Sequence, residues 1–189
     1  MKILNVPNVL TILRMVMIPV FIYVFFAPIE HSMLWAAFIY ALAAFTDFLD
    51  GRIARKYNLI TDFGKLFDPL ADKLLQISAV LCLVIAAVLP LWFLLFYIIK
   101  EGLQVIGGSI LYKKGYVVSS NIFGKVASVL FYIATAAFLL FDIDVIFKNV
   151  ILIVVVSMAV VAFAGYARQF YDQKKEFDRK KELGKEDSV

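Results

Sequence analysis

The amino-acid sequence contains hydrophobic stretches that are too long and too numerous for a water-soluble domain. A helix that crosses a bilayer needs about 20 apolar residues. Hydrophobic residues fill 63% of the 189 positions, which is enough for about six such helices. Charged residues make up 18% of the chain, below the roughly 25% that is usual in soluble domains. The chain is therefore predicted to be an all-α integral membrane protein.

Six transmembrane helices can be placed along the chain. The run at 33–45 is too short to cross a bilayer alone, so its helix must continue as far as Arg55. The stretch at 74–99 would measure about 39 Å as one helix, and Pro90 interrupts it, so we expect two antiparallel helices there. A short interfacial segment is expected before the first helix. The remaining helices are expected at about 9–29, 122–141 and 145–167.

The positive charges predict the orientation. Lysine and arginine gather at 52–65, at 113–125 and from 168 onward, whereas only Lys148 lies on the other side. Cytoplasmic loops carry such an excess, so both termini are predicted to lie on the cytoplasmic side of a cell membrane. We expect residues 1–189 to form one domain, with 172–189 as a charged cytoplasmic tail. The single cysteine excludes an internal disulfide.

Aspartates are concentrated in one segment of this apolar chain. Asp47 and Asp50 are three residues apart and Asp68 and Asp72 are four apart, so each pair shares a face of its helix. Carboxylates that lie close together repel, and they must hold protons or gather cations. A ligand set made only of oxygen suits Mg²⁺, Mn²⁺ or Ca²⁺. Two metal ions that share carboxylates would suit phosphoryl chemistry.

Small residues accompany the aspartates. Gly51, Ala54 and Gly64 would leave open space beside the carboxylates, and Arg55 would offer a planar fork to a phosphate. A purely structural alternative is an interhelical ion-pair network, in which Asp47 or Asp50 pairs with a basic residue and the small residues allow close packing. The candidate basic partners are Arg14, Arg55 and Lys73.

The whole segment resembles a known signature. Its residues run Asp47-x2-Asp50-Gly51-x2-Ala54-Arg55-x8-Gly64-x3-Asp68-x3-Asp72, which is similar to the motif of the CDP-alcohol phosphotransferase family. The resemblance implies a membrane homodimer that transfers a phosphatidyl or similar group from a CDP-linked donor to an alcohol and releases CMP. It also implies dependence on Mg²⁺ or Mn²⁺, with one or two ions at a site facing the cytoplasm.

The resemblance assigns roles by position. The implied metal ligands are Asp47, Asp50, Asp68 and Asp72. Asp72 would also be the general base that takes the proton of the acceptor hydroxyl. The implied CDP-binding residues are Asp50, Gly51, Ala54, Arg55 and Gly64.

Other segments resemble the branch of the family that uses glycerol 3-phosphate as acceptor. These are residues 5–14, residues 68–73 and the pair Gly124-Lys125. The resemblance implies phosphatidyl transfer from CDP-diacylglycerol to glycerol 3-phosphate. The candidate acceptor-binding residues are Thr11, Arg14, Lys125 and Arg168.

The acceptor candidates also have structural interpretations. Arg14 could extend toward the membrane interface, and Lys125 could be an ordinary loop charge. Asn8 is interpreted as a cap of the first helix, and capping remains open for Thr11.

Two departures keep a second acceptor open. The chain has Lys100-Glu101 where the glycerol 3-phosphate branch usually has Arg-Glu, and Val126-Ala127-Ser128 where a lysine and a threonine are usual. A cardiolipin synthase of the same family, with phosphatidylglycerol as acceptor, is therefore an alternative. A cation transporter with an aspartate-lined path is an alternative of another class, but it would spread acids across the membrane depth. We expect no nucleic-acid partner.

Overall fold

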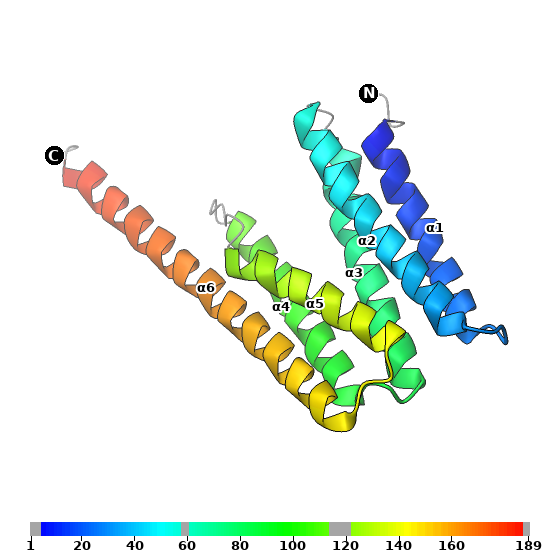
Figure 1. Cartoon of the computed structure of the whole chain (residues 1–189). Coiled ribbons are helices and arrows are strands. Elements are labelled where there is room, and N and C mark those ends of the chain that lie inside the picture. Colours follow the sequence, from blue (N-terminus) through cyan, green and yellow to red (C-terminus); the bar gives the residue numbers. More distant parts are fainter. Residues whose placement is uncertain (1–4, 58–60, 114–121, 187–189) are drawn as a thin grey trace. The chain divides into compact units, whose positions relative to one another are not determined.

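The protein is all-helical in a computed structural model that describes residues 5–57, 61–113 and 122–186 (Figure 1). The prediction of six helices is confirmed, and the described ranges contain no strand. The helices are α1 (Val6–Phe26), α2 (Ser32–Lys56), α3 (Asp62–Ile85), α4 (Leu91–Lys113), α5 (Ile122–Leu140) and α6 (Val145–Glu186).

Helix α1 begins earlier than the hydrophobic run predicts. Asn5 caps it by accepting a hydrogen bond of 3.0 Å from the backbone N–H of Asn8, and Pro7 lies in the first turn, where no N–H is needed. The interpretation of Asn8 as the cap is therefore wrong, because Asn5 does this and Asn8 is buried one turn inside. Val6 also belongs to the helix, and residues 1–4 of the expected interfacial segment lie outside the described ranges. An interfacial position of this segment stays a prediction.

The predicted interruptions and continuations of the other helices are confirmed. Helix α2 runs unbroken through the acidic motif to Lys56. Helix α3 ends at Ile85, and Pro90 precedes α4, with Ala87 in the left-handed conformation (φ 56°) at the turn between them. Helix α6 continues past the predicted end of its apolar part for a total of 42 residues.

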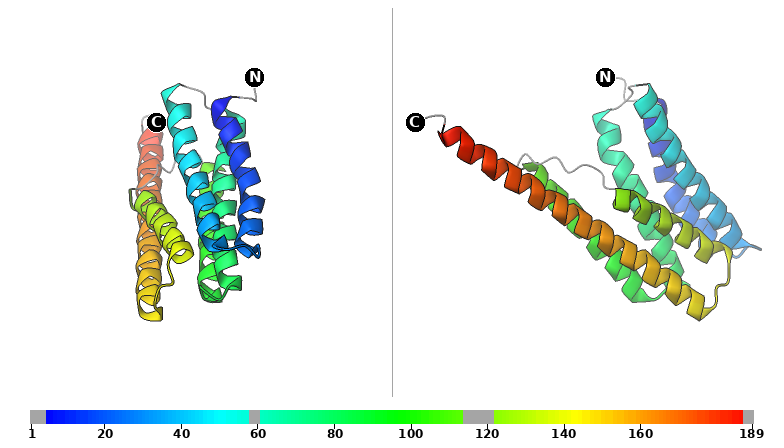
Figure 2. Two further views of the ribbon diagram at one scale, coloured as in Figure 1. Left: turned by 45° about the vertical axis from the view of Figure 1, so that its right-hand side comes forward. Right: turned by 60° about the vertical axis from the view of Figure 1, so that its left-hand side comes forward.

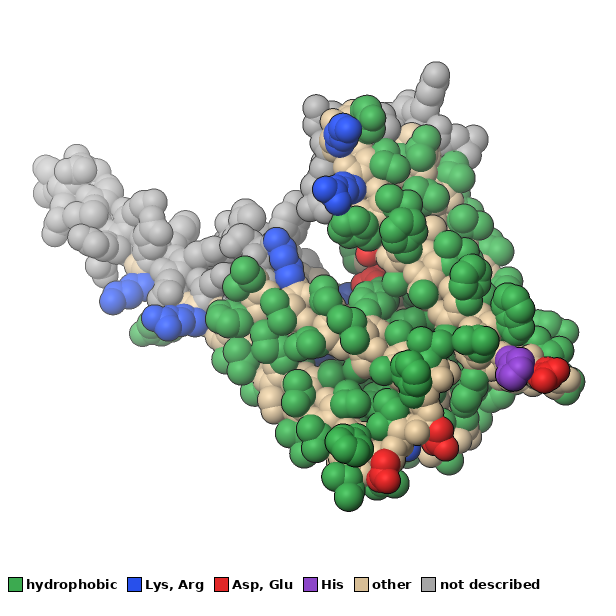
Figure 3. All heavy atoms as spheres, viewed as in Figure 1, with side chains coloured by type: hydrophobic (Ala, Val, Ile, Leu, Met, Phe, Trp, Pro, Cys, Tyr) green, Lys and Arg blue, Asp and Glu red, His purple; other side chains and the backbone are tan. Residues whose placement is uncertain are grey.

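Within the described residues, four helical segments are long and apolar enough to cross a membrane. They are Val6–Phe26, Ser32–Ala54, Ile122–Leu140 and Val145–Arg168. Large hydrophobic side chains cover the face seen in Figure 3, and Tyr23 and Ile153 are 76% and 62% exposed. Such a surface is disfavoured in water and suits lipid. Spanning by α3 and α4, and the cytoplasmic position of both termini, remain predictions.

The chain divides into two compact units, and the acidic motif lies within the first, Met1–Leu95 with Tyr132–Ile143. Here α1 packs against both α2 and α3, and the three helices lie side by side (Figure 2). The rings of Phe21 and Tyr40 join α1 to α2 with centroids 6.1 Å apart. This packing brings the amino-terminal part of α1 against the acidic segments of α2 and α3.

The second unit comprises Phe96–Phe131 and Asp144–Val189. A stacked pair, Tyr97 and Phe131, joins α4 to α5 with ring centroids 4.4 Å apart. Gly124 of α5 faces Tyr166 of α6 so closely that a Cβ atom on the glycine would lie 2.3 Å from the phenol oxygen. A side chain at this position would therefore require the ring of Tyr166 to move. Organisation of residues 1–189 as one domain stays a prediction.

Candidate active site

One face of α1 carries three buried polar side chains. Asn8, Thr11 and Arg14 follow one another at intervals of three residues, and we call them the α1 stripe. Their exposed fractions are 1%, 0% and 0%, respectively. Polar groups buried this completely need hydrogen-bonding partners. The stripe finds those partners on α2 and α3.

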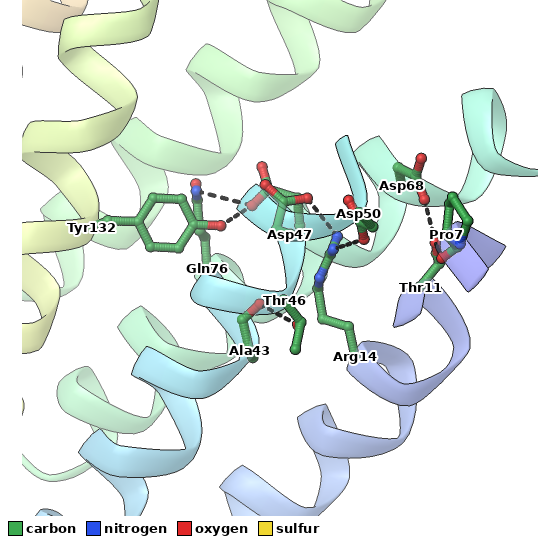
Figure 4. Close-up of polar contacts among 11 residues, drawn as sticks. Pro7, Thr11, Arg14, Ala43, Thr46, Asp47, Asp50, Asp68, Gln76 and Tyr132 are labelled. Atoms are coloured by element: carbon green, nitrogen blue, oxygen red, sulfur yellow. Dashed lines mark hydrogen bonds and ion pairs between the residues drawn. The ribbon is translucent and has the colours of Figure 1, made fainter. Parts of the chain in front are cut away.

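Arg14 bridges the first two aspartates of the motif (Figure 4). Its Nη1 lies 2.6 Å from Oδ1 of Asp47, and its Nη2 donates a hydrogen bond to Oδ2 of Asp50. The Asp47 side chain is 37% exposed, whereas that of Asp50 is 2% exposed. The ion pairs that the sequence left open are therefore present, with Arg14 as the partner. Removing one member of the buried Arg14–Asp50 pair costs about 3–5 kcal/mol, because the other charge remains buried.

Thr11 and Asn8 connect α1 to the start of α3. The Thr11 hydroxyl donates to Oδ1 of Asp68, and it also lies 3.1 Å from the carbonyl oxygen of Pro7 (Figure 4). Thr61 caps α3 by accepting a 3.0 Å hydrogen bond from the N–H of Gly64, and its hydroxyl donates to Oδ1 of Asn8 at 2.8 Å. The beginning of α3, and Asp68 with it, is thereby held against α1.

The last aspartate of the motif has partners from two helices. Tyr132 of α5 donates its hydroxyl to Oδ1 of Asp72, and Nε2 of Gln76 lies 3.5 Å from the same oxygen (Figure 4). The Tyr132 ring contacts that of Tyr40, with centroids 5.7 Å apart. Sequence reasoning missed Tyr132 and Gln76. A tyrosine in an apolar run usually packs against other hydrophobic side chains. Only the contact with Asp72, 60 residues away in the chain, shows that Tyr132 belongs to the site.

The three small residues of the motif lie differently. Gly51 and Ala54 are half-buried on α2, whereas Gly64 is buried against polar atoms. A Cβ atom on Gly64 would lie 3.3 Å from each of three oxygens, on Asn8, Thr61 and Asp68. The side chain of Arg55 lies outside the part of the chain that is described. Binding of CDP by these residues stays a prediction.

We expect Gly64→Ala to lower the transferase activity about tenfold or more, because the added methyl group displaces Asp68 by a few tenths of an ångström and catalytic geometry is sensitive to such shifts. Gly107→Ala is the matched control, since a Cβ atom there meets nothing within 4 Å. Initial rates of CMP release and melting temperatures of both variants test this. Equal activity of the two variants would contradict a tight fit at Gly64.

The acceptor-binding candidates are divided between the two units. Thr11 and Arg14 of α1 are buried and bonded to carboxylates. Lys125 and Arg168 belong to the second unit, where both are exposed. Their contact with an acceptor phosphate stays a prediction.

The motif carboxylates (Asp47, Asp50, Asp68 and Asp72) suit a hard divalent cation by their chemistry. Those of Asp47, Asp50 and Asp68 are close enough to repel one another, and Arg14 pairs with the first two. Within the described ranges, no three acidic, histidine or cysteine side chains are already grouped as metal ligands. The fit therefore rests on the oxygen donors and on the repulsion among them that a bound cation would relieve.

Comparisons with known proteins agree with the motif. Residues 4–163 match the family described as CDP-alcohol phosphatidyltransferase. A CDP-diacylglycerol–glycerol-3-phosphate 3-phosphatidyltransferase of Bacillus subtilis is 36% identical over 72% of this chain and 77% of its own length. A protein of the same name from Rickettsia typhi is 55% identical, over 38% of this chain and 40% of its own.

A second kind of relative carries another name. A cardiolipin synthase (CMP-forming) of Streptomyces coelicolor is 34% identical over 67% of this chain and 61% of its own length. Both names are those of enzymes, which favours an enzyme over the cation transporter considered from the sequence. With the family match covering most of its residues and the motif gathered at one end of α2 and α3, the chain belongs to the CDP-alcohol phosphatidyltransferase family.

Proposed function

We propose that the protein transfers the phosphatidyl group of CDP-diacylglycerol to glycerol 3-phosphate, which yields phosphatidylglycerophosphate and CMP. The observation that carries the proposal is the gathering of Asp47, Asp50 and Asp68 where α1, α2 and α3 meet. The names of the Bacillus and Rickettsia relatives support the choice of acceptor. The protein would then act in phospholipid biosynthesis, with its site at the cytoplasmic face of the inner membrane.

In the proposed reaction, Asp72 accepts the proton of the attacking hydroxyl of glycerol 3-phosphate. The hydroxyl oxygen forms a bond to the phosphorus that carries diacylglycerol, and the bond from that phosphorus to the oxygen of CMP breaks. CMP leaves with the bonding electron pair. Tyr132 and Gln76 both contact Oδ1 of Asp72 and so hold the carboxylate in one orientation.

The motif carboxylates are the residues proposed to hold one or two Mg²⁺ or Mn²⁺ ions. A bound cation would supply neutralisation of the pyrophosphate charge and of the developing charge on CMP. Lys125 and Arg168 are proposed to bind the phosphate of the acceptor, and Arg55 with the small residues of α2 the CDP group. A homodimer is proposed on the family resemblance. For Thr11 and Arg14, the contacts with carboxylates indicate a different role, which is argued below.

Phosphatidylglycerol is the second candidate acceptor. The Streptomyces relative named cardiolipin synthase favours it. So does Lys100, which departs from the usual arginine and is engaged with Glu101 and with the ring of Tyr97, 5.4 Å from its nitrogen. A lipid acceptor would need fewer cations than glycerol 3-phosphate. The two candidates share the donor, the carboxylates and the chemistry, and they differ only in the acceptor.

A comparison of the two acceptors, supplied separately, tests the proposal. The purified protein in detergent receives CDP-diacylglycerol, Mg²⁺ and either acceptor, and the release of CMP is followed. We expect release with glycerol 3-phosphate and little with phosphatidylglycerol. The reverse preference would replace the acceptor, and release with neither, from a folded sample, would contradict the transferase reaction.

A further inference from the structure

We propose that the α1 stripe positions the carboxylates that bind the metal and does not contact the acceptor. In this role Thr11 orients Asp68, Arg14 orients Asp47 and Asp50, and Asn8 fixes the start of α3. The proposal rests on the proposed metal site. It replaces the prediction that Thr11 and Arg14 bind the phosphate of the acceptor.

Burial carries the first step of the argument. The side chains of Thr11 and Arg14 have no exposed surface, whereas the Asp47 side chain between Arg14 and the solvent is 37% exposed. A phosphate dianion would reach Arg14 only after displacing two carboxylates from it. Such an exchange would also leave Asp50, which is 2% exposed, as a buried charge without its cation. The guanidinium is therefore placed behind the carboxylates.

The pattern of oxygen atoms carries the second step. Arg14 engages Oδ1 of Asp47 and Oδ2 of Asp50, and Thr11 engages Oδ1 of Asp68. One donor atom of Arg14 or Thr11 thus contacts one oxygen of each of these carboxylates. A carboxylate held in this way by a neighbouring donor keeps one oxygen for a cation. Groups that orient metal ligands typically change metal affinity about 10- to 100-fold when they are replaced.

The spacing carries the third step. Because Asn8, Thr11 and Arg14 lie on one face, a single rigid helix sets the positions of groups on both α2 and α3. The planar fork of Arg14 reaches two carboxylates at once, which the single nitrogen of lysine does not reproduce. The arrangement also limits repulsion among the carboxylates before a cation arrives, because Arg14 places a positive charge between two of them.

Binding of Mn²⁺, measured from the loss of the free-ion electron paramagnetic resonance signal, tests the proposal without substrate. Thr11→Val and Arg14→Lys are expected to raise the dissociation constant about 10- to 100-fold, and Thr11→Ser, which keeps the hydroxyl, is expected to retain the value of the unmodified protein. Arg52→Lys is the matched control, because Arg52 is exposed on α2 and lies over the ring of Phe48. Should Arg14→Lys fail to fold, the comparison of the Mn²⁺ dissociation constants of Thr11→Val and Thr11→Ser tests the proposal.

A second measurement separates positioning from acceptor binding. At saturating Mn²⁺, the KM for glycerol 3-phosphate should be the same in Thr11→Val and Arg14→Lys as in the unmodified protein. Unchanged Mn²⁺ affinity in these variants, or a raised KM for glycerol 3-phosphate at saturating Mn²⁺, would overturn the proposal. Absence of Mn²⁺ binding in the unmodified protein would also overturn it, while CMP release by the same sample reports separately on the transferase reaction.

Discussion

Replacing Asp72 by asparagine is expected to lower kcat for CMP release by about 10²- to 10⁴-fold, the range that a positioned general base contributes. Asparagine has nearly the same shape as aspartate but does not take the proton of the acceptor hydroxyl. Its amide oxygen still accepts a hydrogen bond, so the contact with Tyr132 can persist. The loss should therefore occur without a change in helix content.

Asp142→Asn is the matched control for Asp72→Asn. Asp142 follows α5, is exposed, and lies outside the acidic motif. Initial rates of CMP release at saturating glycerol 3-phosphate, together with circular dichroism, compare the two variants. Near-normal turnover by Asp72→Asn would rule out Asp72 as the base.

Removal of divalent cations is expected to lower CMP release by more than about 100-fold, since neutralisation of the pyrophosphate by a metal supplies several kcal/mol to the transition state. Added Mg²⁺ or Mn²⁺ should restore the rate. The fold should persist after treatment with EDTA, because Arg14 still pairs with Asp47 and Asp50.

The control for this treatment is EDTA that has been saturated with Mg²⁺ beforehand, which separates chelation from effects of EDTA on the detergent. CMP release and the melting temperature are measured on the same samples. Undiminished CMP release in excess EDTA would exclude catalysis that depends on a metal.

Much of the helical layout could be predicted because it follows from hydrophobic length and from proline. The run at 33–45 is too short to span, and α2 indeed continues to Lys56. Pro90 separates α3 from α4, as the missing N–H of proline requires. The start of α1 could not be predicted from hydrophobicity, because the polar residues of its first turn are buried against α3 rather than placed in solvent.

The acidic site was predictable in its residues and less so in its contacts. The spacing of the aspartates indicates which of them share a helix face, and the motif indicates the family. The partners of these aspartates come from positions far away in the chain: Thr11 is 57 residues from Asp68, and Tyr132 is 60 residues from Asp72. No local sequence pattern indicates such contacts. The contact of Tyr132 with Asp72 and the role of the α1 stripe therefore follow only from the packing of the helices.

Identification of the lipid product tests the central claim most directly. The purified protein is incubated with CDP-diacylglycerol, Mg²⁺ and isotopically labelled glycerol 3-phosphate, and the lipids are analysed by mass spectrometry alongside CMP. We expect labelled phosphatidylglycerophosphate in equal amounts with CMP, and both products from Asp72→Asn at a rate lowered about 10²- to 10⁴-fold. CMP release without label in any lipid, or labelled lipid from Asp72→Asn at the normal rate, would contradict the proposed transfer.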